Sequence, residues 1–330
     1  CDVYNRQPEY GGADIGYLSV SLDMLAEYYW MSRDEKVLEP LKRVIDFLKY
    51  FVHPDASAGG EYASGNSACF LPNGLQVMSN LGNQDAEAAL QLLYQHSEKE
   101  FYFLDAVDDQ CLSHYLLHSF LRAVEKEKDG QRKTVSAAKL PFAYDQEHYF
   151  AESGLLSCTR GNMYMIVGAS KGGVCRIFKG DKECFADYGY RVKLDEEKVA
   201  ATNLHSPDYQ IEYEAYRMKI TGHMNMVKQK ITGIVKRQII SADKKTDINF
   251  ERMIFLQKDK IVIDDLISSP DVICLECADS FSLSHAASEK FFSLTDIGCH
   301  SRTQYPDTMN IRIQRIFYFE SEQIEENVLA

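Results

Sequence analysis

A glycine-rich segment near the start of this sequence carries polar side chains of the kind that hold ligands. Residues 9–17 read Glu-Tyr-Gly-Gly-Ala-Asp-Ile-Gly-Tyr and stand directly before an apolar run with helical spacing. Such a loop could present the Asp14 carboxylate and the Tyr17 phenol to a bound molecule. The same residues could instead form a turn that caps the helix, with the tyrosines packed against it. The sequence leaves both interpretations open.

A second segment, residues 59–74, is a long loop rich in glycine and amide side chains that leads into a helix. Loops of this length in a compact domain often carry binding or catalytic groups. Tyr62, Asn66 and Asn73 offer hydrogen bonds to hydroxyl groups or to a carboxylate. The alternative is a simple connection between two helices.

Residues 108–118 hold two acidic residues followed by a pair of histidines. His114 and His118 are four residues apart and would share one face of a helix, so the pair could hold a metal ion. A third ligand at a recognisable spacing is absent, and we therefore predict no metal. One of the histidines could line a cleft instead, while Asp108 and Asp109 cap the helix.

Residues 169–178 and 185–190 combine cations with aromatic side chains. Lys171, Arg176 and these aromatic residues could contact a polyanion or sugar rings. The alternative is a hairpin turn followed by a strand whose side chains pack in a core.

The composition limits the function classes that fit the chain. Its 330 residues are 45% hydrophobic and 26% charged, which is typical of a folded protein. The net charge is −13, from 36 basic and 49 acidic residues, and argues against a general nucleic-acid binder. No apolar run approaches the roughly 20 residues that span a bilayer, so we expect no membrane segment. Sequence motifs for nucleotide phosphates, dinucleotides, a serine nucleophile and a zinc peptidase are absent.

The cysteines bear on the compartment. There are nine, an odd number, scattered along the chain, which favours buried thiols in a reducing compartment such as the cytoplasm. Cys274 and Cys277 have the spacing of a zinc pair, but residues three apart in a strand-like run face opposite ways. The chain begins at Cys1, so we expect a piece of a longer chain. A periplasmic location would follow if a leader or an upstream region is missing.

The elements that must position these residues change character along the chain. Residues 1–126 show helical periodicity, with apolar residues at three- and four-residue steps. The predicted helices are 17–31, 34–52, 84–96 and 111–124, arranged as antiparallel hairpins. Residues 127–145 are polar and lack an apolar period, and we interpret them as a linker.

Residues 146–330 change to a period of two, which is typical of strands. The predicted strands include 163–169, 174–178, 209–215, 250–256, 260–267, 272–277 and 310–319. Many strands joined by short polar turns, with almost no helix, favour an antiparallel β-sandwich. We therefore expect an α+β protein in which a helical domain precedes a sandwich domain.

Taken in order, the four polar segments and the helix-to-strand change resemble the heparinase II/III-like family. That family joins an α/α toroid of helical hairpins to a C-terminal antiparallel β-sandwich. The matching stretches are residues 11–17, 60–66, 108–115, 152–156, 164–174 and 186–190. The resemblance covers nearly the whole chain. It implies that the helical half is the last, incomplete part of a toroid.

Characterised members of that family are polysaccharide lyases, which cleave uronate-containing chains by β-elimination. The resemblance therefore implies a lyase that acts on an acidic polysaccharide of the glycosaminoglycan kind, without a cofactor. The chemistry needs a group that neutralises the uronate carboxylate, a base for the C5 proton and an acid for the leaving oxygen. Carried over, it implies Asn66 for the carboxylate, Tyr17 and Tyr62 for the base and acid, and His114 as a further catalytic residue. It also implies substrate contacts from Asp14, Glu61, Asn73, Lys171 and Arg176.

The chain departs from the family pattern in two places. Residues 171–190 contain no histidine, although the sandwich of the lyases supplies histidines there. The loop around Gly65 and Asn73 also lacks the Arg and His expected in closer relatives. These departures keep a second hypothesis open, namely a catalytically inactive glycan-binding or polysaccharide-assembly protein on the same scaffold.

The position of four residues would separate the hypotheses. If Tyr17, Tyr62, Asn66 and His114 converge in one groove between the two halves, the enzyme is favoured. If they scatter, the binding protein is favoured. A metal-dependent hydrolase built on His114 and His118 is a more distant third possibility.

Overall fold

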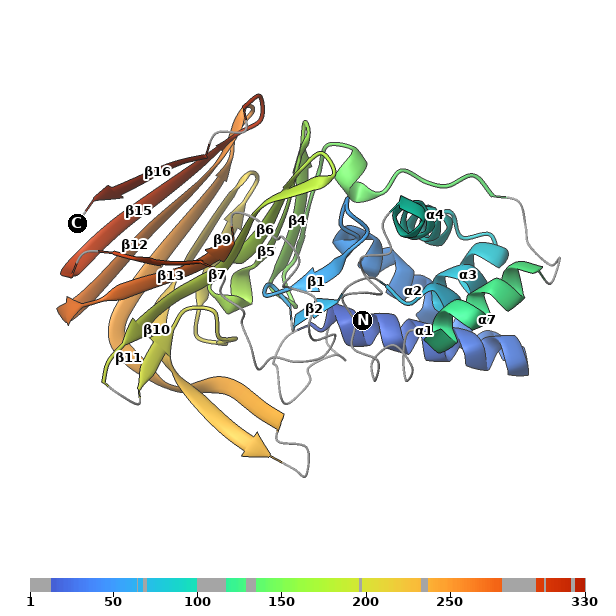
Figure 1. The fold of residues 1–330 in the computed structure, drawn as a ribbon, viewed down its shortest axis with the longest axis horizontal. Coiled ribbons are helices and arrows are strands. Elements are labelled where there is room, and N and C mark those ends of the chain that lie inside the picture. The colour runs from blue at the N-terminus through green and yellow to red at the C-terminus, as the bar shows by residue number, and fades with distance from the viewer. Residues whose placement is uncertain are drawn as a thin grey trace.

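Helices precede strands in the computed structural model of this chain (Figure 1). The structure describes residues 13–63, 65–67, 70–99, 117–128, 135–195, 198–232, 237–280, 301–305, 307–321 and 324–329. Within these ranges there are five α-helices: α1 (Ile15–Ser32), α2 (Leu38–Leu48), α3 (Pro72–Asn80), α4 (Gln84–Lys99) and α7 (Leu117–Lys128).

The local sequence explains where the helices begin. The Asp14 side chain accepts a hydrogen bond from the Tyr17 backbone N–H at 2.8 Å and so caps α1. Pro72 stands in the first turn of α3, where its missing N–H costs nothing. The helix predicted at 34–52 is an α-helix only at its centre, because one 3₁₀ turn precedes it and another follows it. α1 is not buried on all sides, since Met31 near its C-terminal end is 74% exposed.

In the described part of the chain, the strands form one large antiparallel sheet of 14 strands, beside a small pair, β1 (Ala58–Gly60) and β2 (Gly65–Ser67). The main order is β16-β15-β12-β11-β10-β8-β7-β6-β5-β4-β3, with β9 against β10 and β13 between β7 and β14. Its members are β3 (Gln146–Phe150), β4 (Leu155–Arg160), β5 (Met163–Gly168), β6 (Val174–Lys179), β7 (Lys182–Lys193), β8 (Val199–Ala201), β9 (Gln210–Glu214), β10 (Arg217–Thr232), β11 (Arg237–Leu256), β12 (Lys260–Ile273), β13 (Leu275–Ser280), β14 (Ser301–Gln304), β15 (Thr308–Tyr318) and β16 (Ile324–Leu329).

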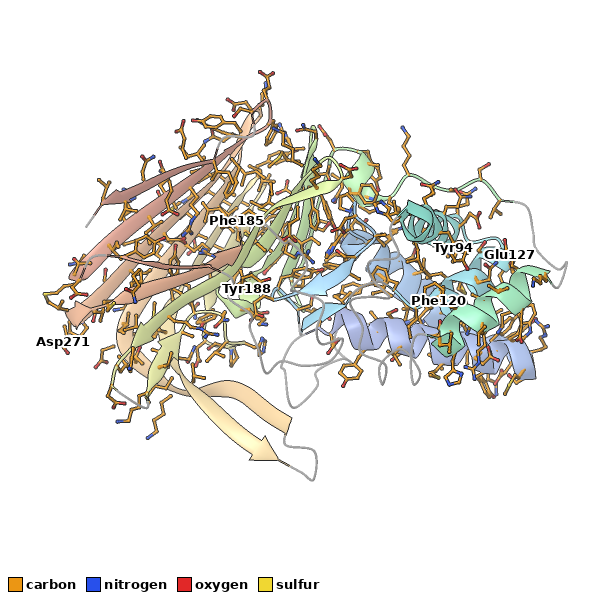
Figure 2. The ribbon with its side chains drawn as sticks, in the orientation of Figure 1. Tyr94, Phe120, Glu127, Phe185, Tyr188 and Asp271 are labelled. Atoms are coloured by element: carbon orange, nitrogen blue, oxygen red, sulfur yellow. The ribbon has the colours of Figure 1, made fainter. Side chains whose placement is uncertain are left out.

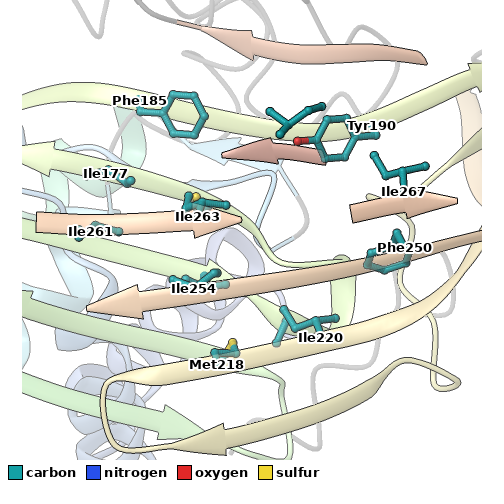
Figure 3. Packing of buried hydrophobic residues seen from close by; sticks show 14 of the residues in the cluster. Ile177, Phe185, Tyr190, Met218, Ile220, Phe250, Ile254, Ile261, Ile263 and Ile267 are labelled. Carbon is teal, nitrogen blue, oxygen red and sulfur yellow. The ribbon is translucent and has the colours of Figure 1, made fainter. Parts of the chain in front are cut away.

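This sheet folds over on itself around one apolar core (Figure 3). Ile177 and Phe185 come from β6 and β7, and they share the core with Met218, Ile254 and Ile263 from β10, β11 and β12. The predicted α+β class with an antiparallel sheet is therefore confirmed. The two layers of the expected sandwich are halves of one continuous sheet.

A second core lies on the opposite face of β4 to β6. Because side chains alternate along a strand, Met165 and Cys175 enter the first core while Tyr164, Ile166 and Phe178 enter the second. The second core also contains the apolar faces of α1, α2 and α3. The helices therefore pack directly on the outer face of β4 to β6.

The finer parts of the fold prediction are not decided by these elements. The five described helices do not show a toroid. The predicted division into residues 1–126, 127–145 and 146–330 stays a prediction. In the described ranges, no helix is both long and apolar enough to cross a membrane.

Candidate functional site

The loop between α2 and β1 lies where the helices meet the outer face of the sheet. A bridge between Val52 and Ala58 closes this loop. Inside it, Asp55 accepts hydrogen bonds from the Ser57 backbone N–H at 3.0 Å and from the Ser57 hydroxyl at 2.6 Å. Ala56 takes a left-handed conformation with φ 64°, which is unusual for a residue with a side chain. The loop thus has a specific, strained shape.

Three polar side chains from distant parts of the chain meet under this loop. His53 Nε2 lies 2.9 Å from the Tyr62 hydroxyl oxygen. Arg176, on β6, places its Nη1 atom 3.2 Å from His53 Nδ1 and donates to the Gly59 carbonyl at 3.0 Å. Arg176 also forms an ion pair and hydrogen bond with Glu183 on β7. We call His53, Tyr62, Arg176 and Glu183 the junction cluster.

Burial sets the protonation states of the junction cluster. His53 is fully buried, and this burial, with the Arg176 charge beside it, holds the pKa of the imidazole well below its ordinary value. Burial raises the pKa of the Tyr62 phenol, so it keeps its proton at neutral pH. Burial alone would lower the pKa of Arg176, but the Glu183 carboxylate more than offsets this effect. The cluster therefore holds a neutral imidazole, a protonated phenol and a guanidinium cation.

A second set of polar contacts fixes the far end of the same loop. Lys171 donates to the Glu61 and Ala63 carbonyls at 2.5 and 2.9 Å, and its Nζ atom lies 3.3 Å from the Glu61 carboxylate. Asn203 donates to the same carboxylate at 3.2 Å. A Cβ atom at Gly168 would lie 2.5 Å from the Tyr62 carbonyl oxygen, so only glycine permits this close approach.

The junction thus unites two of the segments that the sequence singled out. Glu61 and Tyr62 from the loop of residues 59–74 lie against Lys171 and Arg176 from the segment of residues 169–178. Tyr188 on β7 lies on the side of the sheet that faces β1 (Figure 2).

Other predicted residues lie near this cluster or away from it. Asn66 is on β2 opposite Gly59, and its side chain is outside the described part of the structure. Tyr17 is half-buried in the first turn of α1, which packs against β1 and β2. Asp14 is 3% exposed and caps that helix. His114 lies outside the described residues.

Asn73 belongs to a different environment. It is fully buried in α3, where its backbone N–H donates to the Ser119 hydroxyl oxygen at 3.0 Å. Its side-chain amide donates towards Glu27 at 3.3 Å. Asn73 therefore faces α1 and α7, inside the helical part, and does not meet the junction cluster.

Sequence reasoning missed His53 and Glu183. His53 falls between the predicted helix of residues 34–52 and the loop of residues 59–74, and a single histidine at the end of a helix carries no spacing signal. The lack of histidine in residues 171–190 was treated as a departure from the family. In the structure, the histidine beside Arg176 comes from the helical half instead.

Both cations of the junction are already neutralised within the protein. Lys171 and Arg176 are each 7% exposed and are paired with Glu61 and Glu183.

In the described ranges, no group of three or more His, Cys, Asp or Glu side chains could hold a metal ion. The Cys277 side chain of the Cys274–Cys277 pair is not among those described.

A comparison with solved structures gives a distant likeness. No protein-family model matches the chain, and a search of curated proteins finds no match. A solved structure of a heparinase III aligns with 12% sequence identity and a TM-score of 0.45. The alignment covers 83% of this chain and 40% of the heparinase III chain, so this chain spans less than half the length of that structure. The likeness amounts to a distant structural relationship.

Proposed function

We propose that this chain acts on a uronate-containing acidic polysaccharide at the helix–sheet junction and cleaves it by β-elimination. The observation that supports this proposal is the Tyr62–His53 pair, 2.9 Å apart, beside the Arg176 guanidinium. These are the residue types that the reaction needs. The proposal includes the sequence expectation that the helices are the last part of an α/α toroid.

The protonation states assign a role to each side chain. A neutral imidazole can accept the C5 proton, which is the base role. A phenol that keeps its proton at neutral pH can donate it to the leaving oxygen, which is the acid role. A guanidinium neutralises a uronate carboxylate by paired hydrogen bonds. Tyr62 is therefore proposed as the acid and His53 as the base.

Substrate access requires the loop of residues 53–63 to move. His53 and Tyr62 are at most 1% exposed, and Arg176 is held by Glu183. Opening this loop would uncover both side chains and bring Glu61 and Lys171 to the surface with them. Asn66 and Tyr17 remain proposed for carboxylate binding and proton transfer, His114 as a catalytic residue, and Asp14 and Asn73 as substrate contacts.

A specific observation favours a second candidate, a catalytically inactive glycan-binding or polysaccharide-assembly protein. Glu61 and Glu183 neutralise the cations that would otherwise meet a polyanion. In this case the junction cluster holds the helices on the sheet, and recognition of the glycan uses other surfaces.

The deciding experiment offers the chain a panel of uronate polysaccharides and follows the ultraviolet absorbance of unsaturated product. Tyr62→Phe removes one hydroxyl and keeps the ring, so the proposal expects activity to fall by at least about tenfold to a hundredfold. Tyr164→Phe is the matched control. Tyr164 is 2% exposed in the same core and its hydroxyl donates to the Tyr50 carbonyl at 2.5 Å, outside the cluster.

Each outcome bears on one part of the proposal. Lost activity in Tyr62→Phe with activity kept in Tyr164→Phe supports the assigned site. Equal activity in both variants would remove Tyr62 from the mechanism. A folded protein that binds a polysaccharide in the panel but releases no unsaturated product would favour the second candidate.

A further inference from the structure

A tyrosine at the β9–β10 turn has a backbone conformation that bulky residues rarely adopt. Tyr216 has φ 62°, in the left-handed region where a hairpin turn usually carries glycine or asparagine. Two residues, Ala215 and Tyr216, connect the paired ends Glu214 and Arg217. A strained residue that persists in a fold is often kept for its side chain.

The neighbouring strands hold this turn in place. The Tyr216 backbone N–H donates to the Glu147 carboxylate at 2.8 Å, and its carbonyl accepts from the Leu256 N–H at 2.9 Å. The backbone that carries the aromatic ring is therefore fixed before any ligand arrives, so less conformational entropy is lost on binding than from a free loop.

A cation and two further tyrosines extend the surface around Tyr216. The Arg160 guanidinium carbon lies 4.3 Å from the centre of the Tyr216 ring. Tyr149 on the terminal strand β3 and Tyr213 on β9 pack with ring centres 4.7 Å apart, and both are partly buried against the first core. Tyr216 nevertheless stays 46% exposed. We call Tyr216, Arg160, Tyr213 and Tyr149 the tyrosine edge.

We propose that the tyrosine edge is a binding site for a neutral sugar ring. A pyranose presents an apolar C–H face that stacks on a fixed aromatic ring, and hydroxyl groups that accept hydrogen bonds from a planar guanidinium. An apolar peptide would not use the charged and hydroxyl groups of this surface.

The charge of the surroundings selects a neutral sugar over an acidic one. Glu212 and Glu214 are exposed on β9 next to the turn, and Glu147 lies beneath it, against the cations Arg160 and Arg217. This surplus of carboxylates repels a uronate or a sulfated ring.

The tyrosine edge is separate from the junction cluster. Arg160 is at one end of β4, opposite Met163, whereas Gly168, which touches Tyr62, pairs with Leu155 at the other end. Five residue steps along a strand correspond to roughly 17 Å. The site therefore stands whether or not the junction is catalytic.

Saturation-transfer NMR on the whole chain tests the proposal. The probes are neutral β-1,4-linked hexasaccharides of glucose, mannose, galactose and N-acetylglucosamine, with an oligogalacturonate as the acidic counterpart. We expect transfer to ring protons of at least one neutral probe, and binding at least about tenfold weaker in Tyr216→Gly. Glycine suits the left-handed turn, so this variant should fold at least as well as the parent.

Tyr28→Ala provides the matched control, because Tyr28 is also 46% exposed but lies on α1. It should leave sugar binding unchanged. Binding by none of the neutral probes, binding that survives in Tyr216→Gly, or binding of the acidic probe alone would each overturn the proposal. Lyase activity without neutral-sugar binding would overturn this inference alone, and the reverse result would overturn the junction proposal alone.

Discussion

Arg176 and His53 are 123 residues apart in the chain, yet Nη1 of the arginine lies 3.2 Å from Nδ1 of the histidine. The contact joins the outer face of β6 to the loop that follows α2. It places a cation against an imidazole, which is tolerated because Glu183 compensates the charge. The helix–sheet junction therefore depends on a buried ion pair, and its properties can be tested through each partner.

Replacing Arg176 with methionine should destabilise the protein strongly. The substitution leaves the buried Glu183 carboxylate without its cation, and breaking a buried pair in this way typically costs about 3–5 kcal/mol. Adding Glu183→Gln should recover part of that loss, because the unpaired charge is gone. Urea unfolding of the two variants measures the difference in the free energy of unfolding.

Arg43→Met is the control for this pair. Arg43 and Glu39 form a surface pair on α2 with both side chains about two-thirds exposed, so its loss should change stability by less than about 0.5 kcal/mol. An equal effect of Arg176→Met and Arg43→Met would contradict the importance of the buried pair.

The stability should fall as the pH drops below the ordinary histidine range. Burial, followed by the Arg176 charge, lowers the pKa of His53 in the folded state, whereas the unfolded imidazole titrates near about 6.5. Below that pH the His53 imidazole of the unfolded chain binds a proton, whereas the buried imidazole of the folded chain stays neutral. The contribution of His53 is thus fully present above about pH 6.5 and declines on acidification, by about 1.4 kcal/mol between about pH 7.5 and about pH 5.5.

Urea midpoints of the parent and of His53→Gln over this pH range isolate the effect. The variant should lose that part of the pH dependence, while His118→Gln, at an exposed site on α7, should keep it. His148 also has a lowered pKa and contributes equally to both proteins, so the difference between them reports His53. Identical slopes for parent and His53→Gln would show that the imidazole is not held neutral.

The strands of the junction could be predicted from the sequence, and the contacts across it could not. The period-two patterns of residues 163–169 and 174–178 match β5 and β6. The same alternation puts Arg176 and Phe178 on one face of β6. Nothing local shows that this face meets a loop more than 100 residues earlier, because strand periodicity encodes the faces of a strand and not its distant neighbours.

Individual residues show the same limit. Asp14 fits either a ligand-binding loop or a helix cap, and its hydrogen bond to the Tyr17 N–H shows the cap. Asn73 sits in a loop-like stretch of glycines and amides, yet it is buried in α3 by packing against α1 and α7. The single folded sheet, in place of two separate ones, depends on β8, which pairs with both β7 and β10, and no local pattern specifies these pairings.

Substitution of Gly168 tests how closely the loop must approach the sheet. A Cβ atom in Gly168→Ala would lie 2.5 Å from the Tyr62 carbonyl oxygen. Because this oxygen belongs to the backbone, it cannot rotate away as the end of a side chain can. We expect a loss of about 1–3 kcal/mol in the free energy of unfolding, together with faster proteolysis of the loop of residues 53–63.

Gly180→Ala separates this steric effect from backbone strain. Gly180 has φ 61°, but a Cβ atom there would meet nothing within 4 Å, so only the conformational cost of about 1 kcal/mol applies. In the Gly180→Ala variant, the loop of residues 53–63 should be cleaved by protease as slowly as in the parent protein. Comparable proteolysis in both variants would mean that the approach of Gly168 to Tyr62 does not hold the loop.

Tyr216→Gly should leave the stability of the protein nearly unchanged while it removes the main ring of the tyrosine edge. Glycine adopts φ near 62° without the penalty of a side chain, which favours the variant by about 1 kcal/mol. The lost contact is the stack of Arg160 on the ring, and such exposed contacts contribute about 0.5–1 kcal/mol. The net change should therefore be small and not destabilising. Thermal unfolding measures it, and a large drop in the unfolding temperature would mean that the ring serves the fold, which would remove the reason to expect a ligand there.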